Sequence, residues 1–78
     1  MKNKVIELIK DNLALDEEVD IDTPLKSLSL DSLSFINLIV QIEETYDIDF
    51  SFDELDIKKW NNVNDFIQTI KEKLNEKQ

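Results

Sequence analysis

The 78-residue chain contains no cysteine, histidine, arginine or glycine, and only one proline. Without cysteine it can form neither a disulfide nor a thiolate ligand for a metal. Without histidine it lacks the most common general base and the most common metal ligand. Only hydroxyls, carboxylates, amides and lysine ammonium groups remain for chemistry. We therefore expect no catalytic residues, no metal site and no enzymatic activity.

The charge is strongly one-sided, because nine Lys against 18 Asp and Glu give a formal net charge of −9. Such a chain repels nucleic acid, whose binding depends on cationic neutralisation of phosphates. It also avoids anionic membrane surfaces. Partners with basic docking patches are favoured instead, because opposite charges steer the encounter.

Long apolar runs are missing as well. The first residues, Met1–Glu7, contain no uninterrupted apolar stretch, so no signal peptide is predicted. No segment approaches the ~20 apolar residues of a membrane span. We expect a cytoplasmic monomer in which residues 1–78 form a single domain.

Helical periodicity accounts for most of what remains. Apolar residues recur at helical spacing in three stretches, which predicts helices over about Lys2–Asn12, Ser32–Tyr46 and Val63–Leu74. A shorter helical element is expected near Phe52–Lys58. The predicted fold class is all-α, a small bundle of three main helices plus one short helix.

The connections carry their own signals. The segment Ala14–Asp31 has little periodicity and predicts a long loop between the first and second helices. Thr23 and Pro24 resemble a helix cap followed by proline at the first helical position, so a brief turn is expected there. Asp47–Phe52 alternates polar and apolar residues, but it has no partner strand and is assigned to a loop. Because glycine is absent, any positive φ must fall to Asn or Asp.

The helix expected over residues 32–46 has an unusually wide apolar arc. At ~100° per residue, its apolar side chains cover about 220°, whereas a helix packed on one side needs only about 100°. Phe35, Leu38, Ile39 and Ile42 already make a full core face. The wide arc fits a central helix that neighbours cover on two sides, or a helix whose remaining margin is exposed as a docking surface, and both can hold. The margin consists of Leu33, Ile36 and Val40, and we call these three residues the apolar margin.

Ser32 is predicted at the start of this helix, beside the apolar margin. A hydroxyl there is an ordinary N-cap, a role that Asp31 can fill equally well. A phosphate ester would also be well placed, because helix N-termini offer free backbone N–H groups and a positive dipole end. Spacing alone leaves both interpretations open.

The run Leu28–Leu33 (Leu-Ser-Leu-Asp-Ser-Leu), followed by an apolar helix ending in Glu43-Glu44, resembles the phosphopantetheine attachment motif of acyl and peptidyl carrier proteins. The resemblance spans nearly the whole chain, since a long loop precedes the motif and Tyr46–Ile48 follows. It implies a free-standing carrier with 4′-phosphopantetheine attached to Ser32. Asp31 would help to position Ser32 or the metal and transferase that load it. The thiol of the arm would hold an acyl or aminoacyl group as a thioester.

The same resemblance implies partners. These are a phosphopantetheinyl transferase, an adenylating or acyl-loading ligase, and downstream transferase or synthase enzymes. They are expected to dock on a recognition face formed by the apolar margin and two carboxylates of the same helix, Glu43 and Glu44.

Other positions bear on the subtype. Ser34 and Asn37 stand where fatty-acid carriers usually have acidic residues, and Ser29 stands where the family often has glycine. The segment Glu54–Trp60 is similar to the Trp-containing third-helix region of D-alanyl carrier proteins, and carriers of nonribosomal peptide and polyketide pathways show related patterns. The resemblance implies one of these specialised pathways. Trp60 is equally explained as a residue that closes the core over the last helix.

Bulky side chains bear on the cargo. Phe35, Phe50 and Phe52 leave little room for a deep acyl cavity near Leu38 and Ile42, which favours a small or amino-acid cargo. Two alternatives stay open. One is a fatty-acid synthesis carrier, and the other is an acidic interaction module that binds a basic partner without covalent chemistry.

Overall fold

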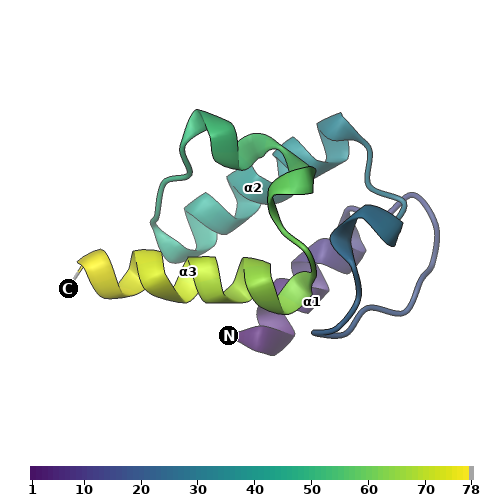
Figure 1. Cartoon of the computed structure of the whole chain (residues 1–78), viewed down its shortest axis with the longest axis horizontal. Coiled ribbons are helices and arrows are strands. Elements are labelled where there is room, and N and C mark those ends of the chain that lie inside the picture. The colour runs from purple at the N-terminus through teal and green to yellow at the C-terminus, as the bar shows by residue number, and fades with distance from the viewer. Residues whose placement is uncertain (78) are drawn as a thin grey trace.

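The computed structural model describes residues 1–77 of the chain. Three α-helices and three 3₁₀ helices follow one another (Figure 1): α1 (Lys2–Asp11), η1 (Leu25–Ser27), α2 (Ser32–Tyr46), η2 (Phe52–Leu55), η3 (Ile57–Lys59) and α3 (Val63–Lys77). Over these residues the chain forms no strand, only an isolated bridge between Pro24 and Asn62. The prediction of a small all-α bundle with a long loop after the first helix is confirmed. None of the described helices is both long and apolar enough to cross a bilayer.

Three local predictions were wrong in detail. The short helix expected over Phe52–Lys58 is interrupted at Asp56, which is extended at φ −95° and ψ 119°. The Asp56 carboxylate accepts a hydrogen bond from the Lys58 N–H at 3.0 Å and so starts a new turn, a competition with the helical ladder that Asp is prone to. Pro24 occupies the capping position of η1 rather than its first helical residue. The last helix continues beyond Leu74 to Lys77.

The core lies where the three α-helices meet. Each helix turns one apolar face inward, and the face predicted for α2 is buried as expected. The buried side chains of the α-helices are Val5, Leu8, Ile9, Phe35, Leu38, Ile39, Ile42, Val63, Phe66, Ile67 and Ile70.

An aromatic cluster fills the space between α2 and α3. The Phe66 ring lies 4.9 Å from Trp60, edge to face, 5.9 Å from Phe50 and 6.1 Å from Phe35, measured between centroids. Trp60 is buried against α3, where its Nε1–H donates to the Thr69 hydroxyl at 3.1 Å. The indole therefore closes the core over the last helix, as one of the two interpretations of Trp60 proposed.

The long loop is held by backbone bonds to the start of α3. The N–H groups of Val63 and Asn64 donate to the carbonyls of Thr23 and Ile21, at 3.0 and 2.9 Å. The first turn of a helix has no internal acceptor for its N–H groups, so these bonds satisfy donors that would otherwise be open. The loop is thus fixed to the bundle, and with it the segment that leads into α2.

The end of α2 needs a left-handed residue, and Asp47 supplies it. Its φ of 55° makes it the one non-glycine residue of the described chain with a positive φ. The sequence predicted that Asn or Asp would take such a position, and this is confirmed. Lys77 Nζ pairs with Asp47 Oδ2 at 2.8 Å and ties the end of α3 to the end of α2.

Candidate functional site

The site begins with the cap of α2. Asp31 is extended, its Oδ1 accepts from the Ser34 N–H at 2.7 Å, and its carbonyl accepts from the Phe35 N–H at 2.9 Å. These are the contacts of an N-cap residue. Of the two candidates for this role, Asp31 is the cap, and Ser32 is the first residue inside the helix.

Ser32 is exposed at this position. Because Asp31 makes the capping bond, the Ser32 hydroxyl is not needed to hold the helix start. Its backbone belongs to the first turn of a 15-residue helix, where the dipole favours negative charge. Within residues 1–77 the Ser32 hydroxyl makes no hydrogen bond, and it lies at an electropositive helix end.

Asp31 stays ionised at neutral pH. Hydrogen bonds from the Ser34 N–H and hydroxyl lower the pKa of its carboxyl below the ordinary 3.8. Its Oδ1 is engaged by the helix, while the side chain as a whole is exposed. An ionised residue therefore directly precedes Ser32 in the chain.

Substitution of Asp31 by Ala is expected to lower the thermal unfolding midpoint by about 4–8 °C, because the Ser34 N–H loses its acceptor. Asp31→Asn is the matched control, since Asn caps nearly as well and should retain most of the midpoint. Circular dichroism during heating measures both. Equal midpoints for the wild type and Asp31→Ala would show that the cap contributes nothing.

The segment leading into the cap is clamped by Ser29. The Ser29 N–H donates to Glu17 Oε2 at 2.9 Å, and the Ser29 hydroxyl donates to the same oxygen. In return, Ser29 accepts from two backbone N–H groups of the loop, Leu15 to the hydroxyl at 3.0 Å and Ala14 to the carbonyl at 3.2 Å. A glycine at this position would lack the hydroxyl bonds, so Ser29 fixes the loop to the approach of Ser32.

Sequence reasoning missed this role of Glu17, which lies in the acidic run Asp16–Glu18 of the loop, although the serine in place of a frequent glycine was the available signal. Its partner lies 12 positions away, a pairing that only the fold reveals. The Ser29 hydroxyl and then the Ser29 N–H lower the pKa of the Glu17 carboxyl below its ordinary 4.5.

Replacing Glu17 by Gln is expected to lower the thermal midpoint at pH 7, and the difference from the wild type should shrink in acid. A carboxyl with a lowered folded pKa stabilises the fold above its unfolded value, here 4.5, and loses that effect as the pH falls through the folded pKa. Midpoints measured from pH 7 to pH 3 check this. A difference that stays constant over the range would contradict it.

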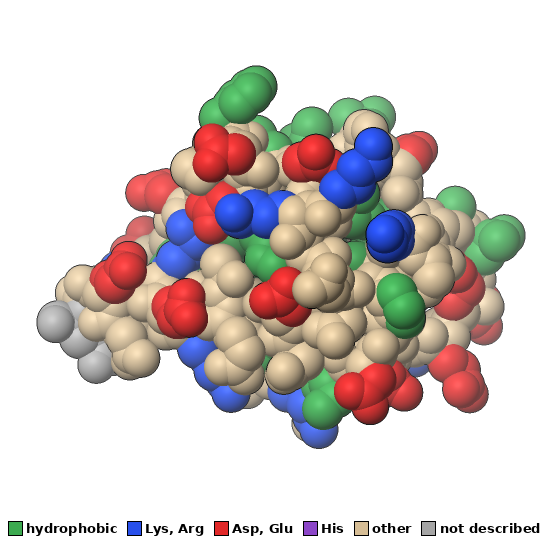
Figure 2. All heavy atoms as spheres, viewed as in Figure 1, with side chains coloured by type: hydrophobic (Ala, Val, Ile, Leu, Met, Phe, Trp, Pro, Cys, Tyr) green, Lys and Arg blue, Asp and Glu red, His purple; other side chains and the backbone are tan. Residues whose placement is uncertain are grey.

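The apolar margin of α2 is exposed: Leu33, Ile36 and Val40 are all solvent-accessible. Of the two interpretations of the wide arc, coverage by neighbouring helices is therefore wrong for these three side chains. Figure 2 shows hydrophobic side chains along the upper edge of the molecule, over α2 and η2, with acidic groups among them. Exposed apolar groups that lie together in this way are typical of binding surfaces.

The two carboxylates predicted beside the margin differ from each other. Glu44 is exposed. Glu43 is half-buried, and its Oε2 accepts from the Phe50 N–H at 2.9 Å, so it also holds the loop after α2. One of the two is thus partly committed to the fold.

Phe52 was expected to help fill the interior, and this is wrong. Its side chain is 89% exposed, at the first position of η2. Phe35 and Phe50 do pack in the aromatic cluster. Leu38 and Ile42, near which an acyl chain was considered, are fully buried.

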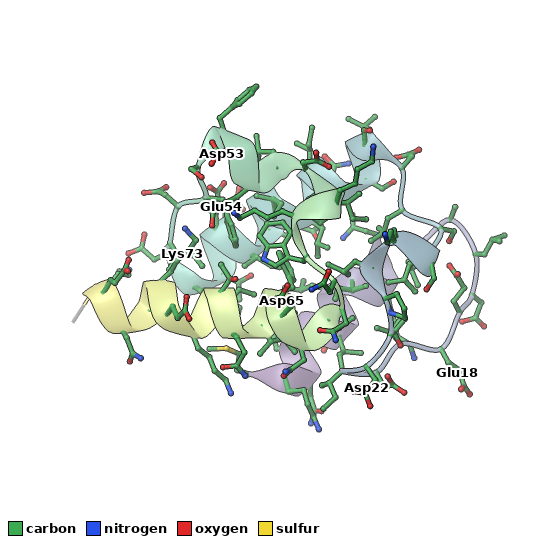
Figure 3. All side chains as sticks on the ribbon, viewed as in Figure 1. Glu18, Asp22, Asp53, Glu54, Asp65 and Lys73 are labelled. Carbon is green, nitrogen blue, oxygen red and sulfur yellow. The ribbon has the colours of Figure 1, made fainter. Side chains whose placement is uncertain are left out.

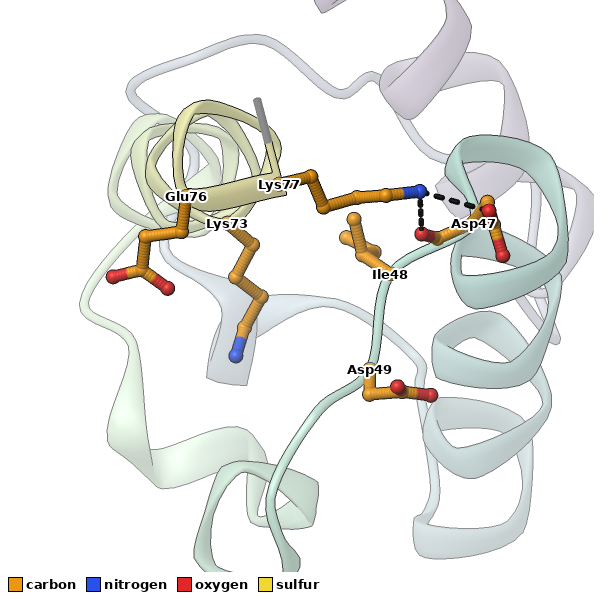
Figure 4. A pocket seen from close by; sticks show the side chains of 6 residues that line it. All are labelled: Asp47, Ile48, Asp49, Lys73, Glu76 and Lys77. Atoms are coloured by element: carbon orange, nitrogen blue, oxygen red, sulfur yellow. Dashed lines mark hydrogen bonds and ion pairs between the residues drawn. The ribbon is translucent and has the colours of Figure 1, made fainter.

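A pocket of about 410 Å³ lies at the opposite end of α2 (Figure 4). Its lining residues are Asp47, Ile48, Asp49, Lys73, Glu76 and Lys77. At a rise of ~1.5 Å per residue, the 15-residue helix separates it from Ser32 by ~22 Å. The pocket is therefore separate from the helix start.

Comparison with known proteins identifies the family. A family model described as "Phosphopantetheine attachment site" matches residues 3–70. The chain belongs to this family. It is a carrier protein that bears a covalently attached 4′-phosphopantetheine, and acyl or aminoacyl groups are held on that arm.

Two curated relatives are similar to the chain over nearly their whole length. The carrier is 32% identical to the D-alanyl carrier proteins of Lactococcus lactis subsp. cremoris strains MG1363 and SK11. Each alignment spans 79 positions and covers 97% of the carrier and 99% of the relative. The resemblance noted in the sequence is thereby confirmed.

Proposed function

We propose that Ser32 is the residue that bears the phosphopantetheine arm. The observation that carries this is the exposed Ser32 hydroxyl at the first residue of α2, relieved of the capping role by Asp31. Of the nearby serines, Ser27 donates its hydroxyl to the Pro24 carbonyl and Ser29 is bonded to Glu17. Among the serines near the motif, Ser32 combines exposure with the first position of an α-helix.

The surroundings of Ser32 fit a phosphodiester. The first turn of α2 offers backbone N–H groups and the positive end of the helix dipole. When bound, the arm supplies the terminal thiol that holds cargo as a thioester. Asp31, ionised and exposed, helps to align the hydroxyl and to hold a divalent cation brought by the loading transferase.

We infer an aminoacyl cargo of the D-alanyl type. The similarity to two D-alanyl carrier proteins over nearly their whole length supports this. So does the core, where Phe35, Phe50, Trp60 and Phe66 pack ring against ring in the space between α2 and α3. A small cargo on the arm needs no cavity in the protein.

The carrier itself supplies no catalytic group and acts through partner enzymes. A phosphopantetheinyl transferase attaches the arm, an adenylating ligase loads the amino acid, and a downstream transferase or synthase removes it. The exposed apolar margin, together with Glu44 and the half-buried Glu43, forms the docking face for these enzymes. The net charge of −9 favours partners with basic rims, and the carrier works as a cytoplasmic monomer.

Intact-protein mass spectrometry tests the proposal in two steps. Incubation with coenzyme A and a phosphopantetheinyl transferase of broad specificity should raise the mass by one phosphopantetheine. Addition of ATP, D-alanine and a D-alanine-adenylating ligase should then add one alanyl group that hydroxylamine releases. If the first gain does not occur, the attachment proposal fails. If only a fatty acyl group can be loaded, the proposed cargo is wrong.

A further inference from the structure

We propose that Phe52 is an aromatic anchor that inserts into an apolar pocket, rimmed by Lys or Arg, on the adenylating ligase that loads the cargo. The docking surface would then extend from the apolar margin of α2 onto η2. This inference rests on the proposed carrier function. It adds a residue outside the helix that the sequence motif marks.

The exposure of Phe52 is extreme. At 89% it exceeds every other large hydrophobic side chain of the described residues, including Leu33 at 69% and Leu15 at 67%. Single exposed apolar residues are ordinary in proteins, so exposure alone decides nothing. Two further features distinguish Phe52, namely the way its backbone is held and the charges around it.

The turn that displays Phe52 is fixed on both sides. Before it, the Ser51 N–H and hydroxyl both donate to Glu54 Oε1, at 2.8 and 3.0 Å, in a capping box. After it, the same Glu54 oxygen accepts from Lys73 Nζ at 2.8 Å. Figure 3 shows Lys73 reaching from α3 towards η2, where Glu54 lies.

This ion pair is largely removed from water, since the side chains of Glu54 and Lys73 are only 12% and 20% exposed. Lys73 Nζ also lies 5.0 Å from the centroid of the Phe50 ring, a cation–π contact. Burial opposes ionisation of Glu54, but hydrogen bonds from Lys73 and Ser51 outweigh it and lower the pKa of that carboxyl. The network therefore persists at neutral pH and joins η2 to α3.

A fixed backbone matters because it lowers the entropy lost on binding. An exposed aromatic on a mobile loop must be ordered when it docks, whereas one on a held turn is already placed. Aromatic side chains, Phe among them, are enriched in the buried cores of protein–protein interfaces. A partly buried ion pair and a capping box thus hold a turn whose first residue faces solvent.

Charge indicates the kind of partner. Asp49 and Asp53 are exposed on either side of Phe52 in the sequence, and neither forms an ion pair within residues 1–77. Figure 3 shows Asp53 on the outer side of η2, away from α3. An apolar pocket with a basic rim on a protein satisfies both the ring and the carboxylates. An anionic bilayer would repel them.

The position of η2 also supports a docking surface that is shared with the apolar margin. η2 packs against α2, and hydrophobic side chains project above both elements along the upper edge in Figure 2. An enzyme that docks on the apolar margin therefore has η2 within its footprint. One continuous surface would carry Leu33, Ile36, Val40 and Phe52.

The test compares the wild type, Phe52→Ala and Leu15→Ala, each first converted to its holo form with coenzyme A and a phosphopantetheinyl transferase. Leu15 is the matched control, because it is a large, exposed apolar residue on the loop after α1. All three should gain one phosphopantetheine, which checks the proposed function independently. With a D-alanine-adenylating ligase, Phe52→Ala should raise the KM for the holo carrier about tenfold with kcat unchanged. Leu15→Ala should stay within about twofold.

The proposal is overturned if Phe52→Ala is fully converted to the holo form and the ligase has the same KM for it as for the wild-type carrier. Thermal midpoints of the two variants within about 4 °C of the wild type exclude a folding effect. Sedimentation of the wild type and co-pelleting with phosphatidylglycerol vesicles complete the test. Dimer formation or vesicle binding that is lost in Phe52→Ala would assign the ring to another occupant and would also overturn the proposal.

Discussion

Ser32→Ala is expected to take up no phosphopantetheine at all under conditions in which the wild type is fully converted. The substitution removes the only atom, Ser32 Oγ, that the proposed attachment uses. The fold should not change, because the cap of α2 belongs to Asp31 and Ala is a good residue for the first turn. Intact-protein mass after incubation with coenzyme A and a phosphopantetheinyl transferase measures the conversion.

Ser34→Ala is the matched control for this experiment. It removes a hydroxyl two positions further along the same helix and leaves the Ser34 N–H that Asp31 accepts. We expect full conversion of Ser34→Ala and an unfolding midpoint of Ser32→Ala within about 4 °C of the wild type. A mass gain in Ser32→Ala equal to that of the control would show that the arm is attached to another residue.

Phe66→Ala is expected to lower the free energy of unfolding by about 3–5 kcal/mol, the usual cost of deleting a buried aromatic ring. Phe66 is fully buried and contacts Phe35, Phe50 and Trp60, so its loss removes three ring–ring contacts at once. A domain of this size has a total stability near the low end of about 5–15 kcal/mol. Much of the protein should therefore be unfolded at 37 °C.

Urea denaturation followed by circular dichroism checks this value. Phe52→Ala is the control, because the same chemical change at an exposed site should cost less than about 0.5 kcal/mol. The slope of free energy against urea should stay constant for both variants. A loss below about 1 kcal/mol for Phe66→Ala would contradict the placement of the aromatic cluster at the centre of the core.

The sequence predicted the helices because their signal is local and periodic. The face of α2 formed by Phe35, Leu38, Ile39 and Ile42 followed from spacing alone, and so did the use of Asp at the one positive φ. The break at Asp56 was missed, because a side-chain bond to the Lys58 N–H competes with the helix over only two residues.

Periodicity could not predict the side-chain hydrogen bonds, whether their partners lie close together in the chain or far apart. Whether Asp31 or Ser32 caps α2 was open until the bond to the Ser34 N–H was seen. The pairing of Glu17 with Ser29 spans 12 positions, and that of Glu54 with Lys73 spans 19. Phe52 was counted with Phe35 and Phe50 as a bulky residue that fills the interior, yet its side chain is exposed at the start of η2.

The central claim is that the arm is attached to Ser32, and site localisation by mass spectrometry tests it most directly. Cleavage of the holo protein after lysine releases residues 27–58, a peptide with five serines: Ser27, Ser29, Ser32, Ser34 and Ser51. Fragmentation of this peptide should place the whole added mass on Ser32 and leave the other four unmodified. Phosphopantetheine found on any of those four, or outside the peptide, would contradict the account.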